Sequence, residues 1–213
     1  MTLSFKEDHI SQIPALMMLE KVGYTYLTPA EAMELRGGNS GNVLLEPILR
    51  EQLAKINTVQ VSSQRTTVFS EQNITAGIEA LQNLPMAEGF MTASQMAYDL
   101  LTAGKTLEQI VDGDKKSYVM QYIDWKHIEN NAFHVTEEFA VSRTGMSDTY
   151  RPDIVLFVNG IPLCVIECKR PDIKDSLKQA ISQHLRNQKE DGIRSLYVYS
   201  ALLLATNVNE VSY

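Results

Sequence analysis

The chain has 213 residues, of which 44% are hydrophobic and 21% are charged, and this composition is ordinary for a globular domain with one substantial core. Its formal net charge of −7 argues against a free-standing protein that binds DNA without sequence preference, because such proteins carry a basic face. No apolar run approaches about 18 residues and the first residues lack a signal-peptide core, so we expect a cytoplasmic protein with no membrane span.

The first half of the chain carries mainly helical signals. Ser4 and Glu7 form a capping-box pattern ahead of a helix that should reach about Val22, and Thr28-Pro29-Ala30-Glu31 repeats the pattern with proline at the first helical position. Helical spacing of apolar residues and capping signals predict three more helices, over about 43–56, 70–84 and 92–103.

After Gly104 the pattern changes, because aromatic and β-branched residues gather in short runs that are typical of strands. One helix is predicted among these strands over about 175–189, with its packed side formed by Leu177, Ala180, Ile181, Leu185 and Gln188. The predicted strands cover about 117–125, 133–141, 153–157, 161–169, 196–199 and 202–205.

This order of elements predicts an α/β fold with a central mixed sheet flanked by helices and a helical N-terminal part. We expect residues 1–213 to form a single domain, with a mainly helical part at about 1–104 and a sheet-containing core at about 105–213.

The segment RPDIVLFVNGIPLCVIECKRPD, residues 151–172, is the part of the chain that most clearly indicates chemistry. An apolar run follows Asp153, Asn159-Gly160 predicts a tight turn, and a second apolar run ends in Glu167-Cys168-Lys169. Such a hairpin puts two carboxylates and one amine at one end of a small sheet. These groups can hold Mg²⁺ beside a phosphodiester and position a water molecule for attack.

The proposed site sets a condition on the geometry of the hairpin. A simple two-residue turn would put Asp153 and Glu167 on opposite faces of the sheet, since side chains alternate along a strand. A three-residue loop or a β-bulge, with Gly160 in the left-handed conformation, would bring them to one face. Apolar neighbours predict that Glu167 is buried, where a charge is paired or bound to a metal. A structural ion pair is the other interpretation of the cluster.

The rest of the sequence mainly excludes other kinds of site. Cys164 and Cys168 lie about 13 Å apart on a predicted strand, whereas a disulfide needs about 7 Å, so we expect two reduced thiols. The sequence contains no phosphate-binding loop of nucleotide-driven motors and no Cys or His quartet for zinc. The four scattered histidines are expected at the surface or at strand ends, and they are His9, His127, His134 and His184.

The segment at 151–172 resembles the nuclease motif of the restriction (R) subunit of type I restriction enzymes, a branch of the PD-(D/E)xK nucleases. The similarity extends upstream to LLEPILREQLAKIN and downstream to LYVYSALLLATN, and so covers most of the chain. It implies a restriction-endonuclease-like core that cuts duplex DNA, in which Asp153 and Glu167 bind Mg²⁺ and Lys169 orients the attacking water. We expect the Cys168 carbonyl as a further metal ligand.

The resemblance also implies two more site residues. Gln183 matches the glutamine of a Gln-x-x-x-Tyr helix motif that accompanies the nuclease centre, and Asn187 stands at the position of the tyrosine. Some members carry an acidic residue on an early helix, for which Glu46 is the candidate.

By the same resemblance, the chain is expected to be a fragment of a longer protein whose helicase-like motor domains hydrolyse ATP. Its partners would be double-stranded DNA and the modification and specificity subunits of the restriction complex. Two alternatives stay open. The chain could be a PD-(D/E)xK nuclease of another helicase–nuclease system for repair or defence, or a docking module of the same fold that has no catalytic function.

Overall fold

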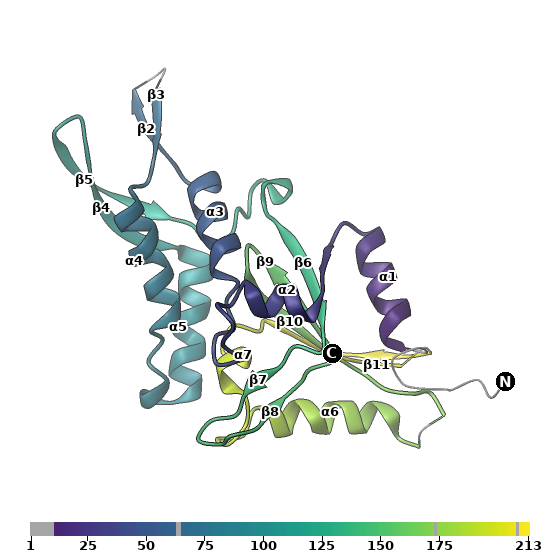
Figure 1. Ribbon diagram of the computed structural model, residues 1–213. Helices are drawn as coiled ribbons and strands as arrows, with labels where there is room; N and C mark the ends of the chain where they lie inside the picture. Colours follow the sequence, from purple (N-terminus) through teal and green to yellow (C-terminus); the bar gives the residue numbers. More distant parts are fainter. Residues whose placement is uncertain (1–10, 63–64, 173, 208) are drawn as a thin grey trace. The chain divides into compact units, whose positions relative to one another are not determined.

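A computed structural model describes residues 11–62, 65–172, 174–207 and 209–213, so the Ser4 and Glu7 capping pattern lies outside the described residues. The chain forms an α/β fold with a mixed sheet of six strands flanked by helices, as predicted (Figure 1). It divides into two compact units. The first contains Met1–Val43, Phe133–Phe157 and Ile161–Tyr213, and the second contains Leu44–Ala132 and Val158–Gly160.

The six-stranded sheet has the order β1-β6-β9-β10-β11-β12. β1 runs parallel to β6, β10 runs parallel to β11, and β12 is antiparallel to β11. β9 and β10 are neighbours joined by only two residues, which requires an antiparallel pair. The strands are β1 (Thr25–Leu27), β6 (Phe133–Glu137), β9 (Ile154–Val158), β10 (Ile161–Cys168), β11 (Leu202–Thr206) and β12 (Val211–Ser212).

Helices cover both faces of this sheet, with α1 (Ile13–Lys21) on one face and α6 (Ser176–Asn187) on the other (Figure 1). α2 (Pro29–Glu34) begins with the predicted capping box, in which Thr28 and Glu31 each accept a hydrogen bond from the other's backbone N–H. The short helix α7 (Arg194–Tyr197) and the ribbon of β7 (Val141–Ser142) and β8 (Thr149–Tyr150) complete the first unit.

Two predictions for this part of the chain are wrong. The segment 196–199 was expected to be a strand, but Leu196 and Tyr197 are buried residues of the helix α7. The apolar residues expected to pack α6 against its sheet include Ile181 and Leu185, which are 41% and 63% exposed. The buried residues of α6 are instead mostly polar, and they are Ser176, Ala180, His184 and Asn187.

The second unit contains the three helices predicted at 43–56, 70–84 and 92–103. They are α3 (Glu46–Ile56), α4 (Glu71–Gln82) and α5 (Phe90–Ala103). Ser70 caps α4 and Gly104 ends α5 with φ of 79°. The strands of the second unit form two antiparallel hairpins, β2 (Thr58–Ser62) with β3 (Arg65–Val68) and β4 (Lys105–Val111) with β5 (Asp114–Met120). The 3₁₀ turns η2 (Met86–Glu88) and η3 (Ile128–Asn130) also belong to this unit.

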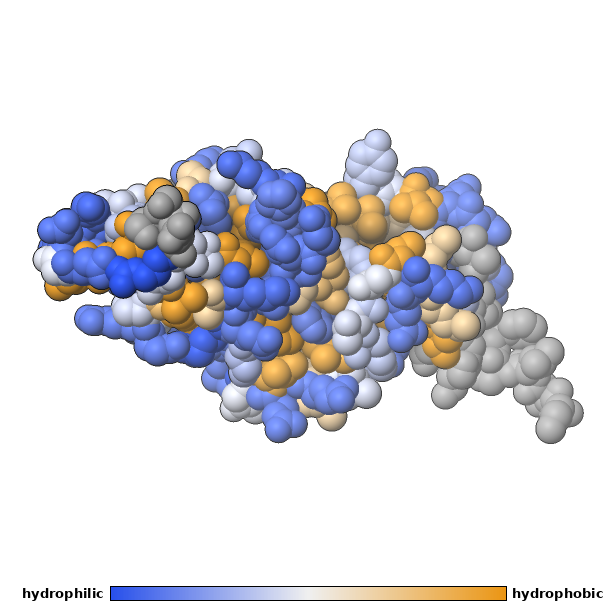
Figure 2. Space-filling view, turned by 90° about the horizontal axis from the view of Figure 1, so that it is seen from above, coloured by the Kyte–Doolittle hydropathy of each residue, from blue (hydrophilic) through white to orange (hydrophobic). Residues whose placement is uncertain are grey.

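The apolar side chains that stay exposed lie in small groups among hydrophilic ones on the face drawn in Figure 2. Among the described residues, no helix is both long enough and apolar enough to cross a membrane. The two cysteines are buried thiols that form no disulfide, as predicted.

Candidate functional site

The turn between β9 and β10 consists of Asn159 and Gly160, whose φ angles are 53° and 80°. Positive φ at both central residues is typical of a type I′ turn. A Cβ atom on Gly160 would lie 2.6 Å from the carbonyl oxygen of Leu45, so only glycine fits this position. The left-handed Gly160 is therefore confirmed, and the two-residue connection excludes the three-residue loop but not the β-bulge, the other geometry that was predicted.

The side chains nevertheless reach the faces that the site requires. A regular two-residue hairpin would pair Ile154 with Val165 and put both on one face. Instead, one buried cluster joins even-numbered residues of both strands, so the register shifts by one residue between the turn and the far end of β10, as in a β-bulge. That cluster contains Leu16, Val135, Ile154, Leu156, Cys164, Ile166 and Cys168. The odd-numbered Asp153 and Glu167 share the opposite face.

Asp153 and Glu167 meet at the end of the hairpin. The Asp153 carboxylate accepts a hydrogen bond from the backbone N–H of Cys168 at 2.6 Å, and its side chain is also hydrogen-bonded to Glu167. Glu167 has no exposed surface. Burial, followed by the negative charge of Asp153, raises the pKa of Glu167 to about 9. At neutral pH the two carboxyl groups therefore hold one proton and one negative charge between them.

Lys169 follows β10 directly and reaches back to the same place. Its Nζ lies 3.7 Å from Oδ2 of Asp153 and donates a hydrogen bond to the Cys168 carbonyl at 2.9 Å. The structure thus brings together Asp153, Glu167, Lys169 and the Cys168 carbonyl, which are the groups that the sequence singled out.

The helix α6 supplies two amides to the buried carboxyl group. Nε2 of Gln183 donates to one oxygen of Glu167 at 2.5 Å, and Nδ2 of Asn187 donates to the other at 3.3 Å. These residues are one helical turn apart, and α6 forms the connection between the parallel strands β10 and β11, so it lies over the face that carries Glu167. The geometry accordingly places Gln183 at the site, together with Asn187.

A chain of hydrogen bonds continues from Asn187 into the core. Nδ2 of Asn187 also donates to the Tyr197 hydroxyl at 3.3 Å, and that hydroxyl lies 2.9 Å from Nδ1 of His184. The other ring nitrogen of His184 lies 2.9 Å from the Leu204 carbonyl, which can only accept, so Nε2 carries the proton and Nδ1 accepts from Tyr197. Burial lowers the pKa of His184, which favours this neutral ring.

Neither His184 nor Tyr197 was expected at the site. His184 was predicted to lie at the surface or at a strand end, but it is a buried residue of α6. Tyr197 belongs to the segment that was predicted as a strand. The spacing of four residues from Gln183 to Asn187 was the sequence signal that pointed to this side of α6. No local pattern distinguishes Tyr197, because its partners lie on another helix.

The oxygen atoms at this site fit a divalent cation. Within the described parts of the chain, no group of three or more His, Cys, Asp and Glu side chains is placed to hold a metal ion. Mg²⁺ does not need such a group, because it keeps several waters and is often held by one or two carboxylates. Burial and then the negative charge of Asp153 raise the pKa of Glu167, and a bound cation would relieve the repulsion between the two carboxylates.

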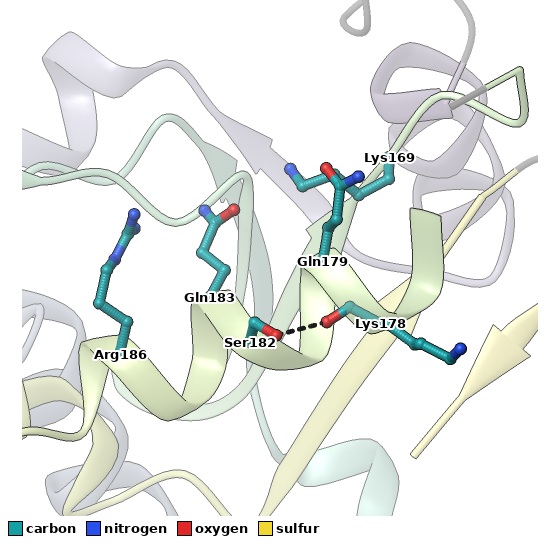
Figure 3. Close-up of a pocket in the computed structure, with 6 residues that line it drawn as sticks. All are labelled: Lys169, Lys178, Gln179, Ser182, Gln183 and Arg186. Carbon is teal, nitrogen blue, oxygen red and sulfur yellow. Dashed lines mark hydrogen bonds between the residues drawn. The ribbon is translucent and has the colours of Figure 1, made fainter. Parts of the chain in front are cut away.

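An open hollow of about 370 Å³ adjoins the site on the side of α6 (Figure 3). It is lined by Lys169, Lys178, Gln179, Ser182, Gln183 and Arg186. Three of these six residues are cationic and none is acidic, although the chain as a whole is acidic. Lys169 and Gln183 line the hollow and also contact the carboxylate pair.

Glu46 lies at the start of α3, in the second unit. Its carboxylate accepts hydrogen bonds from Arg50 at 3.1 Å and from Gln82 at 3.3 Å. These contacts account for its position in that unit, and its role as a metal ligand stays a prediction.

Comparison with known proteins places the chain in a family. Residues 4–213 match the family model described as the type I restriction enzyme R protein N terminus. The chain is 30% identical over 209 residues to the type I restriction enzyme HindI endonuclease subunit of Haemophilus influenzae, and this match covers 94% of the chain and 18% of the relative. It is 24% identical over 214 residues to the type I restriction enzyme EcoprrI endonuclease subunit of Escherichia coli, with 100% of the chain and 59% of the relative covered.

A third relative is similar over a shorter stretch. The type I restriction enzyme SsaAORF53P endonuclease subunit of Staphylococcus saprophyticus is 29% identical over 102 residues, which are 47% of the chain and 10% of that protein. The chain thus spans only part of the length of these relatives, and less than a fifth of the Haemophilus influenzae protein.

Proposed function

Since this chain belongs to the family of type I restriction enzyme R protein N termini, we propose that it is the Mg²⁺-dependent endonuclease domain of such an enzyme and hydrolyses phosphodiester bonds of duplex DNA. The observation that carries the proposal is the meeting of Asp153, Glu167 and Lys169 on one face at the end of the β9–β10 hairpin. Two carboxylates and an amine at one point are the groups that metal-assisted hydrolysis of a phosphodiester requires.

In this proposal Asp153 and Glu167 hold the metal ion, with the Cys168 carbonyl as a further oxygen ligand. When bound, Mg²⁺ acts as a Lewis acid that lowers the pKa of a coordinated water and neutralises charge on the phosphate. As a metal ligand Glu167 would be ionised, so the proton that it shares with Asp153 would be released to solvent. The Lys169 ammonium turns from Asp153 and the Cys168 carbonyl to the attacking water and to the negative charge that develops on the phosphate.

Gln183 and Asn187 act as positioning residues for Glu167, because their amides hold its two oxygens from α6. A carboxyl group fixed by two donors presents its remaining lone pairs in one orientation, which reduces the reorganisation needed when a cation binds.

Of the three interpretations that the sequence left open, the family match favours the restriction subunit over a nuclease from another helicase–nuclease system. The names of the relatives describe endonuclease subunits, which supports a catalytic domain rather than a docking module. We further propose that the complete protein carries ATP-hydrolysing motor domains and works with modification and specificity subunits on double-stranded DNA in the cytoplasm.

A thermal unfolding experiment tests the metal site. Mg²⁺ or Mn²⁺ should raise the melting temperature of the chain, because a ligand that binds only the folded state stabilises it by mass action. Asp153→Asn keeps the shape of the side chain but removes its charge, so the gain should disappear. Asp99→Asn, at an exposed position on α5, is the matched control and should keep the gain. An equal gain in Asp153→Asn would place the metal elsewhere and favour the docking module.

A cleavage assay in the assembled restriction complex tests catalysis. Lys169→Ala should abolish DNA cleavage and leave ATP hydrolysis and DNA binding intact, because Lys169 acts only at the phosphate that is cut. Lys189→Ala removes one exposed positive charge beyond the end of α6 and should cut at the wild-type rate. Cleavage by Lys169→Ala at a near wild-type rate would exclude Lys169 from the mechanism.

A further inference from the structure

We propose that Arg186, together with Gln179, binds a backbone phosphate of the DNA strand next to the bond that is cut. This inference rests on the proposed function and deepens it, since it assigns the hollow beside the carboxylate pair to a phosphate group of the substrate. None of the roles considered above for α6 involves Arg186.

The Arg186 side chain is held in place without being buried. Its guanidinium lies over the Tyr150 ring, 4.5 Å from the ring centroid, and its Nη2 lies 3.2 Å from Oδ1 of Asn187, to which it donates. A second guanidinium, that of Arg143, lies over the same ring at 4.4 Å. Tyr150 thus supports two cations, and stacking of this kind orients a guanidinium before any ligand arrives.

The two arginines differ in how their charge is balanced. Arg143 forms ion pairs with Asp148 at 3.1 Å and with Asp191 at 2.5 Å, so its charge is already matched inside the protein. Arg186 is exposed, and its guanidinium forms no ion pair with any carboxylate among the residues that the structure describes. A guanidinium that is fixed in place but lacks an anionic partner is suited to an anion from outside the chain.

The surroundings of Arg186 complete a site for a phosphate. Gln179, Gln183 and Arg186 follow one another at helical spacing, and Figure 3 shows their side chains rising from the same side of α6, with Gln179 beside Lys169. The Lys178 side chain points away from them in that view, and its Nζ pairs with Asp175 at 2.9 Å. Arg186 and Gln179 thus present donor groups to the hollow, and Nε2 of Gln179 also donates to the Lys174 carbonyl at 3.0 Å.

The chemistry of the hollow suits a phosphodiester. The planar fork of a guanidinium matches the two free oxygens of a phosphate, and amide N–H groups are common additional donors to DNA phosphates. Lys169 and Gln183 belong both to the hollow and to the carboxylate site, so a strand cut at Asp153 and Glu167 would have its neighbouring phosphate within this hollow.

The test is an NMR titration of the 213-residue chain in EDTA with a DNA duplex of about 12 base pairs, at concentrations that reveal weak binding. The side-chain N–H signals of Arg186 and Gln179 should shift in a saturable way. Arg186→Ala should raise the dissociation constant about tenfold, since one charged hydrogen-bonded contact is lost. It should also lower the slope of log affinity against log salt by about one. Lys189→Ala, with the same change in charge outside the hollow, should change the dissociation constant by less than about twofold.

Arg186→Lys guards against an indirect effect through Asn187, because it keeps the positive charge and one donor. The affinity of Arg186→Lys for DNA should lie between those of Arg186→Ala and the wild type, because an ammonium group does not match two phosphate oxygens as a guanidinium does. The proposal is overturned if Arg186→Ala and Lys189→Ala weaken binding equally, or if the signals of the hollow do not respond to DNA.

Two further measurements separate this inference from the proposed function. Arg186→Ala should keep the Mg²⁺-dependent rise in melting temperature, because the carboxylate pair is intact. Absence of cleavage by the wild-type complex would contradict the nuclease proposal whatever the titration shows. Cleavage by Arg186→Ala with an unchanged KM for DNA in the same complex would contradict only the role of Arg186.

Discussion

Glu167 is a carboxyl group without exposed surface in a strand whose other residues are almost all apolar. Transfer of a charged group into such surroundings is unfavourable by several kcal/mol unless partners offset it. Two amides and a shared proton offset it here, so the pair Asp153 and Glu167 holds only one negative charge at neutral pH. The residue that is hardest to bury in this sheet is also the residue that the chemistry needs.

The raised pKa of Glu167 predicts how the stability of the metal-free chain depends on pH. Its ordinary value is 4.5 and its folded value is about 9. Between these values the unfolded chain releases the proton while the folded chain keeps it, so the free energy of unfolding should fall as the pH rises through this window. Chemical denaturation in EDTA at about pH 5, 7 and 9 measures the trend.

Glu167→Gln removes the titration and should flatten this part of the curve. Glu88→Gln, at an exposed glutamate in the second unit, is the control and should follow the wild type. Parallel curves for the wild type and Glu167→Gln would mean that Glu167 titrates normally in the folded chain.

At the scale of single elements, α6 turns its polar residues rather than its apolar ones to the sheet. His184 and Asn187 are buried, whereas Ile181 and Leu185 are exposed. The strand face beneath α6 carries Glu167, which requires hydrogen-bond donors in place of hydrocarbon. The orientation of this helix therefore follows from the site and departs from the usual apolar pattern.

The hydrogen-bond chain below α6 predicts the effect of losing one hydroxyl group. Tyr197→Phe would leave Nδ1 of His184 without a donor and would remove an acceptor from Asn187, both inside the core. The free energy of unfolding should drop by about 1–3 kcal/mol. Tyr98→Phe, at a tyrosine that is 61% exposed, should change it by less than about 0.5 kcal/mol. A similar small loss in both variants would show that the chain of bonds contributes little to stability.

Two Asx-Gly hairpin turns, Asp112-Gly113 and Asn159-Gly160, allow a matched test of the β9–β10 turn. Gly160 and Gly113 have φ of 80° and 88°, and each follows a residue that also has positive φ. An added Cβ would meet the Leu45 carbonyl oxygen at Gly160 but nothing within 4 Å at Gly113.

Both alanine variants should lose stability from the strained φ, and Gly160→Ala should lose about 1–3 kcal/mol more. Urea denaturation of the two variants measures the difference. Equal losses would mean that the backbone around Leu45 moves aside at little cost.

At the scale of the whole molecule, the net charge of −7 limits what the chain can do alone. The cations of the hollow form a local exception on a surface that repels DNA overall. We therefore expect the isolated chain to cut duplex DNA at least about a hundredfold more slowly than the assembled complex at the same Mg²⁺ concentration. Gel assays with equal molar amounts of each measure the ratio, and comparable rates would contradict the idea that DNA binding comes mainly from other parts of the complex.

Much of the fold was predictable because the signals are local. The capping box at Thr28 and Glu31, the helices of the second unit and the Asn159-Gly160 turn all depend on residues close together in the sequence. No strand was predicted at β1, β2, β3, β4, β8 or β12, and α7 was predicted as a strand. The identity of α7 depends on burial of Leu196 and Tyr197 by distant parts of the chain, which overrides their β-propensity.

The site was predictable in part for the same reason. Asp153, Glu167 and Lys169 stand in a short motif, and their convergence follows once the register of the hairpin is known. Tyr197 and the stacking of Arg186 on Tyr150 depend on segments that meet only in the folded chain. No spacing along the sequence predicts contacts of that kind.

The shifted register of the β9–β10 hairpin has a consequence for how this segment can vary by mutation. Side chains alternate with a period of two, so loss of a single codon between Gly160 and Glu167 would carry the glutamate through the sheet into the apolar layer of Ile154 and Ile166. Loss of two codons would return it to its own face, one step short along the strand. Insertions or deletions of an odd number of residues in this stretch should therefore disrupt the site more than those of an even number. Conservative substitutions should be tolerated at positions where deletion of one residue is not.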